Sequence, residues 1–203
     1  MQLLSSPTSP YARKVRVVIL EKGLADQVEL LPGVPLGSDA DAAPVRAANP
    51  LGKIPALIRQ GAPTLFDSPV ICEYLDSLGH GPILFPHEGE ARWSALRLQA
   101  LGDGVADAAF AIVMEGRRPE SERSAEWLGR WNGAIQRAAD AVETELSAGE
   151  IAFDIGAISL ACAFGYVAFR LPQIDWRTGR PALSAGFDRV SGRASIAATT
   201  PPV

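Results

Sequence analysis

Residues 1–80 and the rest of the chain carry different hydrophobic patterns, and this change constrains the fold more than any other feature of the sequence. Short runs of β-type residues alternate with helical patterns in the first part only. The pattern predicts the following elements there: strands at Gln2–Ser5, Val28–Leu31, Ala56–Ile58 and Thr64–Phe66, helices at Pro10–Leu24 and Pro69–Leu78, and a loop-rich stretch from Pro32 to Pro50.

This order of elements, βαβ followed by ββα, is typical of a thioredoxin-like α/β domain. Strand signals end near residue 88, and helices are predicted at Glu90–Glu115, Ser124–Leu146, Ile151–Arg170 and Pro181–Val190. The fold class is therefore α/β followed by all-α. We expect a thioredoxin-like domain at 1–80, a Pro/Gly linker at 81–87 and a helical domain at 88–203.

Composition excludes several other classes of protein. Apolar residues make up 47% of the 203 residues and charged residues 21%, which argues against a disordered chain. Two cysteines cannot staple a chain of this length as a disulfide scaffold. The net charge of −4 disfavours a nucleic-acid partner, because binding phosphates requires clustered Lys and Arg.

The most apolar stretch runs from Ile155 to Phe169, which is 15 residues. A membrane-spanning helix needs about 20 such residues, so we expect a buried core helix and no membrane partner. The N-terminal sequence lacks the basic and apolar regions of a secretory signal. The expected location is the cytoplasm.

The segment between the first strand and the first helix carries a candidate reactive position. Ser9 is a suitable N-cap, and Pro10 suits the first helical position. In a thioredoxin-like fold the redox cysteine lies here, where helix N–H groups stabilise a thiolate. Ser9-Pro10-Tyr11-Ala12 replaces both cysteines of a Cys-Pro-Tyr-Cys dithiol, so a hydroxyl remains that can donate to the thiolate of another molecule. The alternative is that Ser9 is only a helix cap.

Two further segments suggest a peptide-like ligand. A cis Ile54–Pro55 bond at a strand start would turn the backbone of Ile54 outward, where it can pair with an extended peptide; a plain turn is the alternative. Ser68 is predicted as the N-cap of the helix that Pro69 opens, and Asp67 precedes it. A helix N-terminus suits a carboxylate and an aspartate suits an ammonium group, so together they suit an α-amino-acid end. An ordinary Asp-Ser cap is the alternative.

At these spacings the segments resemble the glutathione S-transferase family along nearly the whole chain. Thr8-Ser9-Pro10-Tyr11-Ala12-Arg13-Lys14 resembles the opening motif of bacterial, serine-type members. Asn49-Pro50-Leu51-Gly52-Lys53-Ile54-Pro55 is similar to the motif Asn-Pro-x-Gly-x-[Val/Ile]-Pro, and Asp67-Ser68 to an acid-serine pair of the family. Stretches frequent in these bacterial sequences also occur at Asp103–Ala108 and at Phe164–Arg170.

The resemblance implies glutathione as co-substrate and a role for each matching residue. Ser9 would hydrogen-bond the glutathione sulfur and lower the pKa of its thiol. Ile54, before cis-Pro55, would pair with the cysteinyl unit, and Lys53 would approach the glycine carboxylate. The γ-glutamyl end would be held by Asp67 and Ser68, with Asp103 contributed by the neighbouring subunit of a homodimer. The residues expected to border the electrophile pocket are Thr8, Asp107, Phe110, Ala111 and Met114.

Three departures from the family pattern affect this interpretation. Residues 32–44 contain no Lys or Arg, so a common contact to the glycine carboxylate is missing. The helix expected from Ile151 keeps the aspartate of a capping box at Asp154 but loses the hydroxyl, a loss that costs about 1 kcal/mol. Thr8 stands beside Ser9 and is an alternative partner for the sulfur.

The function expected from the resemblance is conjugation of the glutathione thiolate to a small apolar electrophile, a detoxification reaction in the cytoplasm. One alternative is a non-catalytic binding or regulatory module on the same fold; another is a glutathione-dependent peroxidase or reductase. Cys72 and Cys162 are interpreted as buried structural thiols. His80 and His87 lack partners at ligand spacing, so no metal site is expected.

Overall fold

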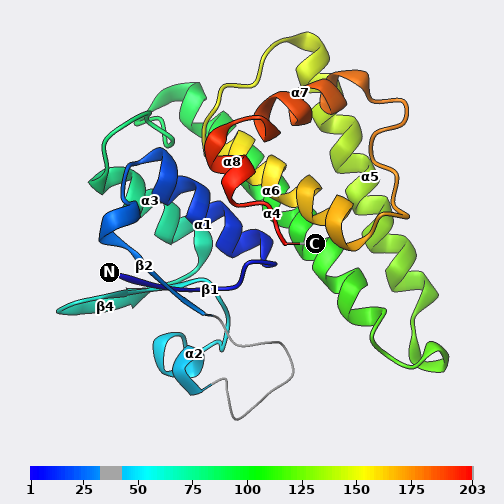
Figure 1. Ribbon diagram of the computed structural model, residues 1–203. Helices are drawn as coiled ribbons and strands as arrows, with labels where there is room; N and C mark the ends of the chain where they lie inside the picture. Colours follow the sequence, from blue (N-terminus) through cyan, green and yellow to red (C-terminus); the bar gives the residue numbers. More distant parts are fainter. Residues whose placement is uncertain (33–42, 203) are drawn as a thin grey trace.

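The computed structural model describes residues 1–32 and 43–202, which form a mixed sheet followed by a set of helices (Figure 1). The strands are β1 (Gln2–Ser5), β2 (Glu29–Pro32), β3 (Ala56–Arg59) and β4 (Ala62–Leu65), in the order β2-β1-β3-β4. Strand β1 is parallel to β2 and antiparallel to β3, and β3 is antiparallel to β4. The predicted α/β class of the first part is confirmed.

Three helices accompany the sheet. Figure 1 shows α1 (Pro10–Glu21) and α3 (Ser68–Leu78) above the sheet and α2 (Ala43–Ala48) below it. Within the loop-rich stretch expected from Pro32 to Pro50, helix α2 was not predicted, and residues 33–42 lie outside the described residues. A 3₁₀ turn at Ala25–Gln27 leads from α1 to β2.

Strand β4 begins two residues earlier than predicted. The sequence suggests a turn that includes Pro63, but Pro63 lies inside β4 and the turn consists of Gln60 and Gly61. Gly61 has a φ of +72°, a conformation that favours glycine. Proline is tolerated in β4 because this strand is at the edge of the sheet, where a missing N–H breaks no ladder.

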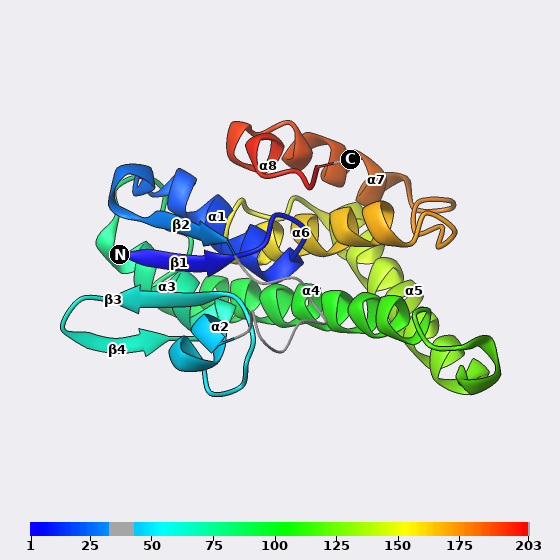
Figure 2. The same cartoon turned by 60° about the horizontal axis from the view of Figure 1, so that its bottom comes forward.

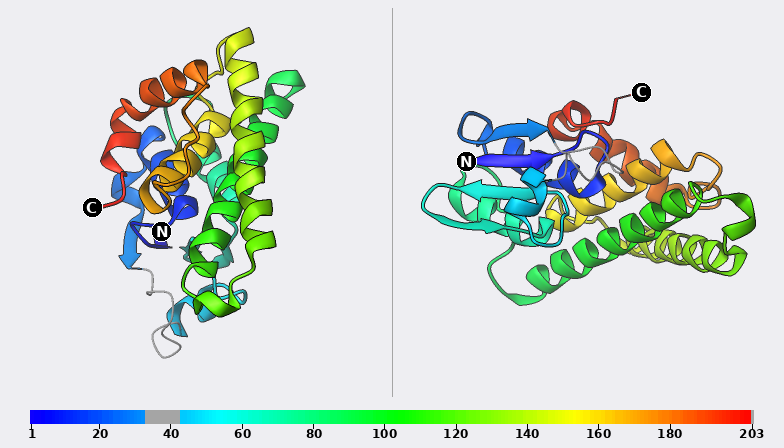
Figure 3. Two further views of the ribbon diagram at one scale, coloured as in Figure 1. Left: turned by 90° about the vertical axis from the view of Figure 1, so that its right-hand side faces the viewer. Right: turned by 90° about the horizontal axis from the view of Figure 1, so that it is seen from below.

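The second part of the chain is helical, as predicted. Its helices are α4 (Gly89–Glu115), α5 (Ala125–Ala148), α6 (Ile155–Arg170), α7 (Pro181–Ser191) and α8 (Ala194–Ala198), with a 3₁₀ turn at Glu120–Glu122. Helix α8 was not predicted. Figures 2 and 3 show α4 and α5 side by side and extending beyond the sheet. Of the helices formed by the described residues, none has the length and apolar character needed to cross a membrane.

Helix α6 begins at Ile155 and not at the predicted Ile151. Asp154 is its N-cap, and the carboxylate accepts from the N–H groups of Gly156 (2.8 Å) and Ala157 (3.2 Å). The carboxylate thus supplies the cap directly, so the hydroxyl that the sequence lacks at Ile151, three residues earlier, is not needed at this helix end.

Helices α4 and α6 approach each other closely through glycines. A Cβ on Gly102 of α4 would lie 2.7 Å from the backbone carbonyl carbon of Ser159, and one on Gly156 of α6 would lie 2.6 Å from the Cβ of Leu98. Gly156 therefore meets the earlier part of α4 and Ser159 the later part, so the two helices run in the same direction. Their C-terminal ends consequently lie on the same side of the molecule.

The apolar core consists of two clusters, and α6 contributes to both. One cluster joins Leu3, Val15 and Leu75 of the first part to Ile155 and Ile158 of α6. The other packs the opposite side of α6, including Phe164 and Val167, against α4, α5 and α7. The expected core-helix character of this apolar run is confirmed, and the two parts of the chain share a core.

The connection between α3 and α4 is held by hydrogen bonds. The carboxylate of Asp76 accepts from the N–H groups of Leu84 (3.0 Å) and Phe85 (3.1 Å). Lys22, which is 3% exposed, places its ammonium 3.0 Å from Asp76 and donates to the Pro82 carbonyl at 2.8 Å. The Pro/Gly segment expected as a linker is thus fixed to α1 and α3.

Candidate functional site

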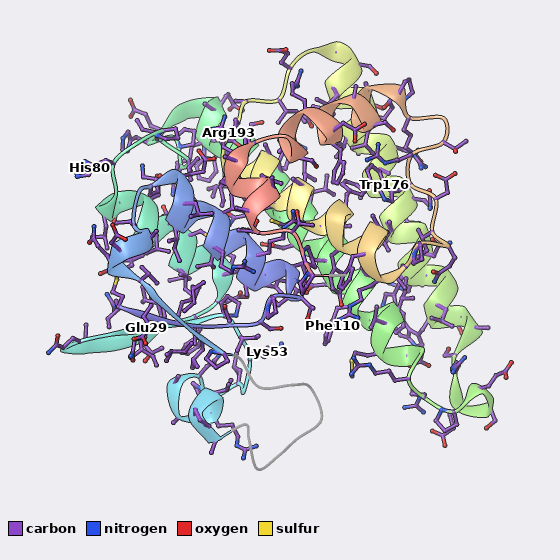
Figure 4. The ribbon with its side chains drawn as sticks, viewed as in Figure 1. Glu29, Lys53, His80, Phe110, Trp176 and Arg193 are labelled. Carbon is purple, nitrogen blue, oxygen red and sulfur yellow. The ribbon has the colours of Figure 1, made fainter. Side chains whose placement is uncertain are left out.

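A cavity of about 690 Å³ lies between the two parts of the chain. It is lined by the β1–α1 loop, the turn before β3, the start of α3, and the facing sides of α4 and α6. The residues considered below that line it are Thr8, Ser9, Tyr11, Asn49, Lys53, Ile54, Pro55, Asp67, Asp107, Phe110, Val113, Arg117, Tyr166 and Arg170. Figure 4 labels Lys53 and Phe110, which face this space from the first and second parts of the chain.

Ser9 lies at the N-terminus of α1, where the sequence predicted a cap. The prediction of the cap is confirmed: the Ser9 Oγ accepts from the Ala12 N–H at 3.3 Å. A hydroxyl that accepts through its oxygen still has its own proton to donate. Ser9 lines the cavity beside the free N–H groups and the positive end of the α1 dipole, a setting that stabilises a bound anion.

Thr8 also lines the cavity, but its hydroxyl lies 3.2 Å from the Ser6 Oγ. The Thr8 N–H donates to the same Ser6 oxygen at 3.4 Å. The Thr8 hydroxyl is thus held by a local side-chain pair, whereas the Ser9 hydroxyl has no side-chain partner among the described hydrogen bonds, which favours Ser9 as a donor into the cavity.

The Ile54–Pro55 peptide bond is cis, as the sequence suggested. Lys53, Ile54 and Pro55 all line the cavity. Asn49, to which the sequence assigned no role, holds this turn in place. Its side-chain amide donates to the Lys53 carbonyl at 2.8 Å, and its side-chain oxygen accepts from the Leu51 N–H at 3.0 Å. An asparagine three residues before a glycine, as Asn49 is before Gly52, is a sequence signal of such a turn.

Asp67 and Ser68 have different places from those predicted. Asp67, not Ser68, is the N-cap of α3, and its carboxylate accepts from the Ser68 N–H. Ser68 is the first residue of α3, is fully buried, and its Oγ has no hydrogen-bond partner among the described residues. Both residue types cap helices well, and here the carboxylate fits the role. Asp67 lines the cavity, whereas Ser68 lies behind it.

The face of α4 toward the cavity is rotated from the predicted one. Asp107 and Phe110 line the cavity, but Ala111 and Met114 do not; Val113 and Arg117 take their place. Residues three and four apart share a helix face, so the spacing alone admits either Val113 or Met114 after Phe110. The packing of α4 on α6 selects Val113. Tyr166 and Arg170 of α6, which sequence reasoning missed, complete this wall.

Tyr11 belongs to the opening motif, but the sequence assigned no role to it. Its hydroxyl donates to the Asp107 carboxylate across the cavity wall. Burial and, next, the hydrogen bond and negative charge of Asp107 raise the pKa of Tyr11, so the phenol stays protonated. This contact connects the start of α1 to the middle of α4. Its partners are 96 residues apart, so no local pattern indicates it.

Asp103 does not line the cavity in this chain. Both of its oxygens accept from the Lys14 ammonium, at 2.6 and 2.8 Å. Burial raises the pKa of Asp103 and the Lys14 charge opposes this shift. A contact from Asp103 to glutathione bound by a neighbouring subunit stays a prediction, and it would have to coexist with this ion pair.

The remaining candidates lie away from the cavity. Cys72 and Cys162 are buried, and burial raises their thiol pKa values to about 12 and about 11. Both histidines are exposed. Within the described parts of the chain, no group of His, Cys, Asp or Glu side chains is arranged to hold a metal ion.

The fold and the cavity define a protein with a thioredoxin-like domain, a helical domain and a ligand site between them. The chain matches the description "Glutathione S-transferase, N-terminal domain" over residues 8–78 and "Glutathione S-transferase, C-terminal domain" over residues 125–188. It is 34% identical to the uncharacterized GST-like protein YibF of Escherichia coli, covering 100% of this chain and 99% of that protein. The chain therefore belongs to the glutathione S-transferase family.

Two solved structures of a glutathione transferase family member from Pseudomonas fluorescens are also similar to this chain. The structure with bound glutathione has 41% identity and a TM-score of 0.91, covering 100% of this chain and 99% of that one. The structure with bound S-(propanoic acid)-glutathione has 39% identity and a TM-score of 0.88, with 100% coverage of both chains.

Proposed function

We propose that the protein is a glutathione transferase in which Ser9 activates the glutathione thiol for attack on a small electrophile. The observation that carries this proposal is the position of Ser9 in the cavity, with its oxygen bonded to the Ala12 N–H and its proton free to donate. Donation from the hydroxyl and from the α1 N-terminus would stabilise a thiolate and lower the pKa of the thiol.

The rest of the cavity suits the ends of a glutathione molecule. Asp67 supplies a carboxylate for the γ-glutamyl ammonium, and the N-terminus of α3, which begins at Ser68, suits the γ-glutamyl carboxylate. The Ile54 backbone at cis-Pro55 suits the cysteinyl unit, and Lys53 suits the glycine carboxylate. The glutathione bound by the Pseudomonas fluorescens relative supports glutathione as the ligand.

The second part of the chain would hold the electrophile. Phe110 and Val113 present apolar side chains to the same cavity. The related structure with S-(propanoic acid)-glutathione supports a cavity that accepts a substituent on the sulfur. Both cysteines are buried and neither lines the cavity, which disfavours a reductase that forms a mixed disulfide with its own thiol.

The test is glutathione binding by calorimetry together with the pKa of the bound thiol, measured from thiolate absorbance near 240 nm. Wild type should bind glutathione with the thiol pKa lowered by at least about one unit, and Ser9→Ala should lose most of that shift. Thr8→Ala is the matched control and should retain it.

Each other outcome has a definite meaning. Absence of glutathione binding contradicts the proposal. Binding with an unshifted thiol pKa supports a non-catalytic binding module. A shift that survives Ser9→Ala but not Thr8→Ala transfers the role to Thr8.

A further inference from the structure

Two arginines line the wall of the cavity that faces the electrophile. Arg170 is the last residue of α6, and Arg117 follows the end of α4, whose last residue is Glu115. Because α4 and α6 run in the same direction, both guanidinium groups lie at neighbouring helix ends. A cation is favoured at a helix C-terminus, so this position is compatible with two like charges in one cavity.

Neither arginine is neutralised by an acidic side chain. Among the residues that the structure describes, no carboxylate lies within ion-pair distance of Arg117 or Arg170. The neighbouring Arg118, in contrast, lies 3.3 Å from Glu122. Arg170 has its guanidinium carbon 4.5 Å from the centre of the Phe169 ring, a contact that helps to orient the side chain.

The two arginines share a third group, the hydroxyl of Tyr166. Tyr166 is 5% exposed and lines the cavity. Burial raises its pKa, and the positive charges of Arg170 and Arg117 oppose that shift, so both guanidinium groups act on the same hydroxyl. The phenol is therefore protonated, and it lines the same cavity as the two arginines.

The acidic side chains of the cavity lie toward its other end. Asp107 is bonded to Tyr11 and precedes Arg117 by ten residues, which corresponds to about 15 Å along a helix. Asp67 belongs to α3, in the first part of the chain. Along α4, Asp107 and Arg117 are thus about three helical turns apart, so the guanidinium group of Arg117 lies beyond the Tyr11–Asp107 contact.

We propose that Arg117, Arg170 and Tyr166 bind a carboxylate carried by the electrophile, so that the preferred substrates are small apolar electrophiles bearing a carboxylate. This assignment rests on the proposed glutathione transferase function. Guanidinium groups pair with carboxylates through charge-assisted hydrogen bonds, and the tyrosine hydroxyl adds a third donor. Phe110 and Val113 provide apolar contacts for the part of the substrate between the carboxylate and the reacting carbon.

A suitable test substrate is 4-(chloromethyl)benzoate, with 4-(chloromethyl)benzamide as its neutral counterpart. In each case the glutathione sulfur forms a bond to the benzylic carbon, the carbon–chlorine bond breaks, and chloride leaves with the electron pair. The thiol proton passes to solvent, so no oxidant or reductant is required. The two substrates have the same shape and differ in a group remote from the reacting carbon, which is a charged carboxylate in one and a neutral amide in the other.

The first experiment compares the binding of the two products, S-(4-carboxybenzyl)glutathione and S-(4-carbamoylbenzyl)glutathione, by calorimetry. Wild type should bind the carboxylate about tenfold more tightly than the amide. Arg117→Gln and Arg170→Gln should each remove most of this preference and leave the affinity for the amide within about twofold. Arg118→Gln is the matched control and should keep the full preference.

The second experiment measures kcat/KM for the two substrates, each corrected for its reaction with free glutathione. The ratio of carboxylate to amide should fall about tenfold in either cavity-arginine variant and stay constant in Arg118→Gln. The preference should also weaken as salt is added, because both guanidinium groups are solvent-accessible.

The outcomes separate the two proposals. If glutathione and the amide product bind but the carboxylate gains nothing, the carboxylate subsite is wrong and the transferase proposal stands. If neither product nor glutathione binds, both proposals are wrong. A preference that persists in the Arg117→Gln, Arg170→Gln double variant also overturns the subsite.

Discussion

The ammonium of Lys14 lies 2.6 and 2.8 Å from the two carboxylate oxygens of Asp103, although the Lys14 side chain is only 1% exposed. This ion pair joins α1 to α4 behind the candidate site. Burial and the negative charges of Asp67 and Asp107 raise the pKa of Asp103, and the charge of Lys14 opposes them. The Lys14 side chain of the opening motif therefore has a structural role in this chain.

Removing Lys14 alone should be strongly destabilising. In Lys14→Met the Asp103 carboxylate stays largely buried without its partner, and we expect a loss of about 3 kcal/mol in the free energy of unfolding, measured with urea. The double variant Lys14→Met, Asp103→Leu should recover most of this loss, because no unpaired charge remains. Equal stability of wild type and Lys14→Met would show that the pair does not form as described.

The close contact of α4 with α6 predicts opposite effects at two glycines of one helix. Gly102→Ala places a Cβ 2.7 Å from the backbone of Ser159 and should cost about 1–3 kcal/mol in thermal or urea unfolding. At Gly104 the Cβ position meets nothing within 4 Å, so Gly104→Ala should be neutral or stabilise the helix by up to about 1 kcal/mol. Equal destabilisation by both changes would contradict this packing.

The cap of α6 predicts a difference between two substitutions of Asp154. Asp154→Ala removes the acceptor for the Gly156 and Ala157 N–H groups and should cost about 1–2 kcal/mol. Burial raises the pKa of the Asp154 carboxyl, so its negative charge is not favoured by the fold at neutral pH. Asp154→Asn keeps an acceptor without the charge and should stay within about 0.5 kcal/mol of wild type near pH 7. A similar loss in both variants would show that the charge itself is required.

Glu21 predicts a pH-dependent contribution to stability at the junction of α1 and α8. Its carboxylate lies 2.7 Å from Arg193 and accepts from Ser195, and the hydrogen bond from Arg193 is the first of the interactions that lower its pKa below the ordinary value of 4.5. A carboxyl group whose pKa is lower in the folded state stabilises the fold above its unfolded pKa. This stabilisation is lost as the pH falls through the folded value.

Glu21→Gln should therefore cost about 1 kcal/mol at pH 7, a value that allows for the 44% exposure of Arg193. The difference from wild type should shrink as urea unfolding is repeated below the ordinary glutamate pKa of 4.5. Glu73→Gln, which disrupts the more exposed pair with Arg92, is the control and should have a smaller effect throughout. A Glu21→Gln penalty that is constant from neutral to acidic pH would contradict the assignment.

Local sequence signals predicted most of the elements and the part of the site that lies next to them. Ser9 with Pro10, and Pro55 at the start of β3, are defined by their immediate neighbours, and the structure places both beside the cavity. The choice between Asp67 and Ser68 as the cap could not be made in this way, because both residue types cap helices well and only the side-chain orientation decides.

The other wall of the cavity depends on how distant segments pack. The spacing on α4 predicts one stripe of residues, but the approach of α6 at Gly102 decides that Val113 and not Met114 faces the cavity. The contact between Tyr11 and Asp107 and the proximity of Arg117 to Tyr166 likewise join separate parts of the chain. Hydrophobic periodicity contains no information on such pairs.

The position of α6 in both core clusters has a consequence for recombining this protein with its relatives. Ile155 and Ile158 pack with the first part of the chain, while Phe164 and Val167 pack with the other helices. In a chimera with its crossover between α3 and α4, the residues of the first part of the chain come from one parent. The α6 residues Ile155 and Ile158 that pack against them come from the other parent. A chimera that takes the α4 and α6 cavity residues from another relative should therefore keep the α6 residues that face α1 from the parent that supplies the sheet. Only the α6 residues that face α4 and the cavity should be replaced.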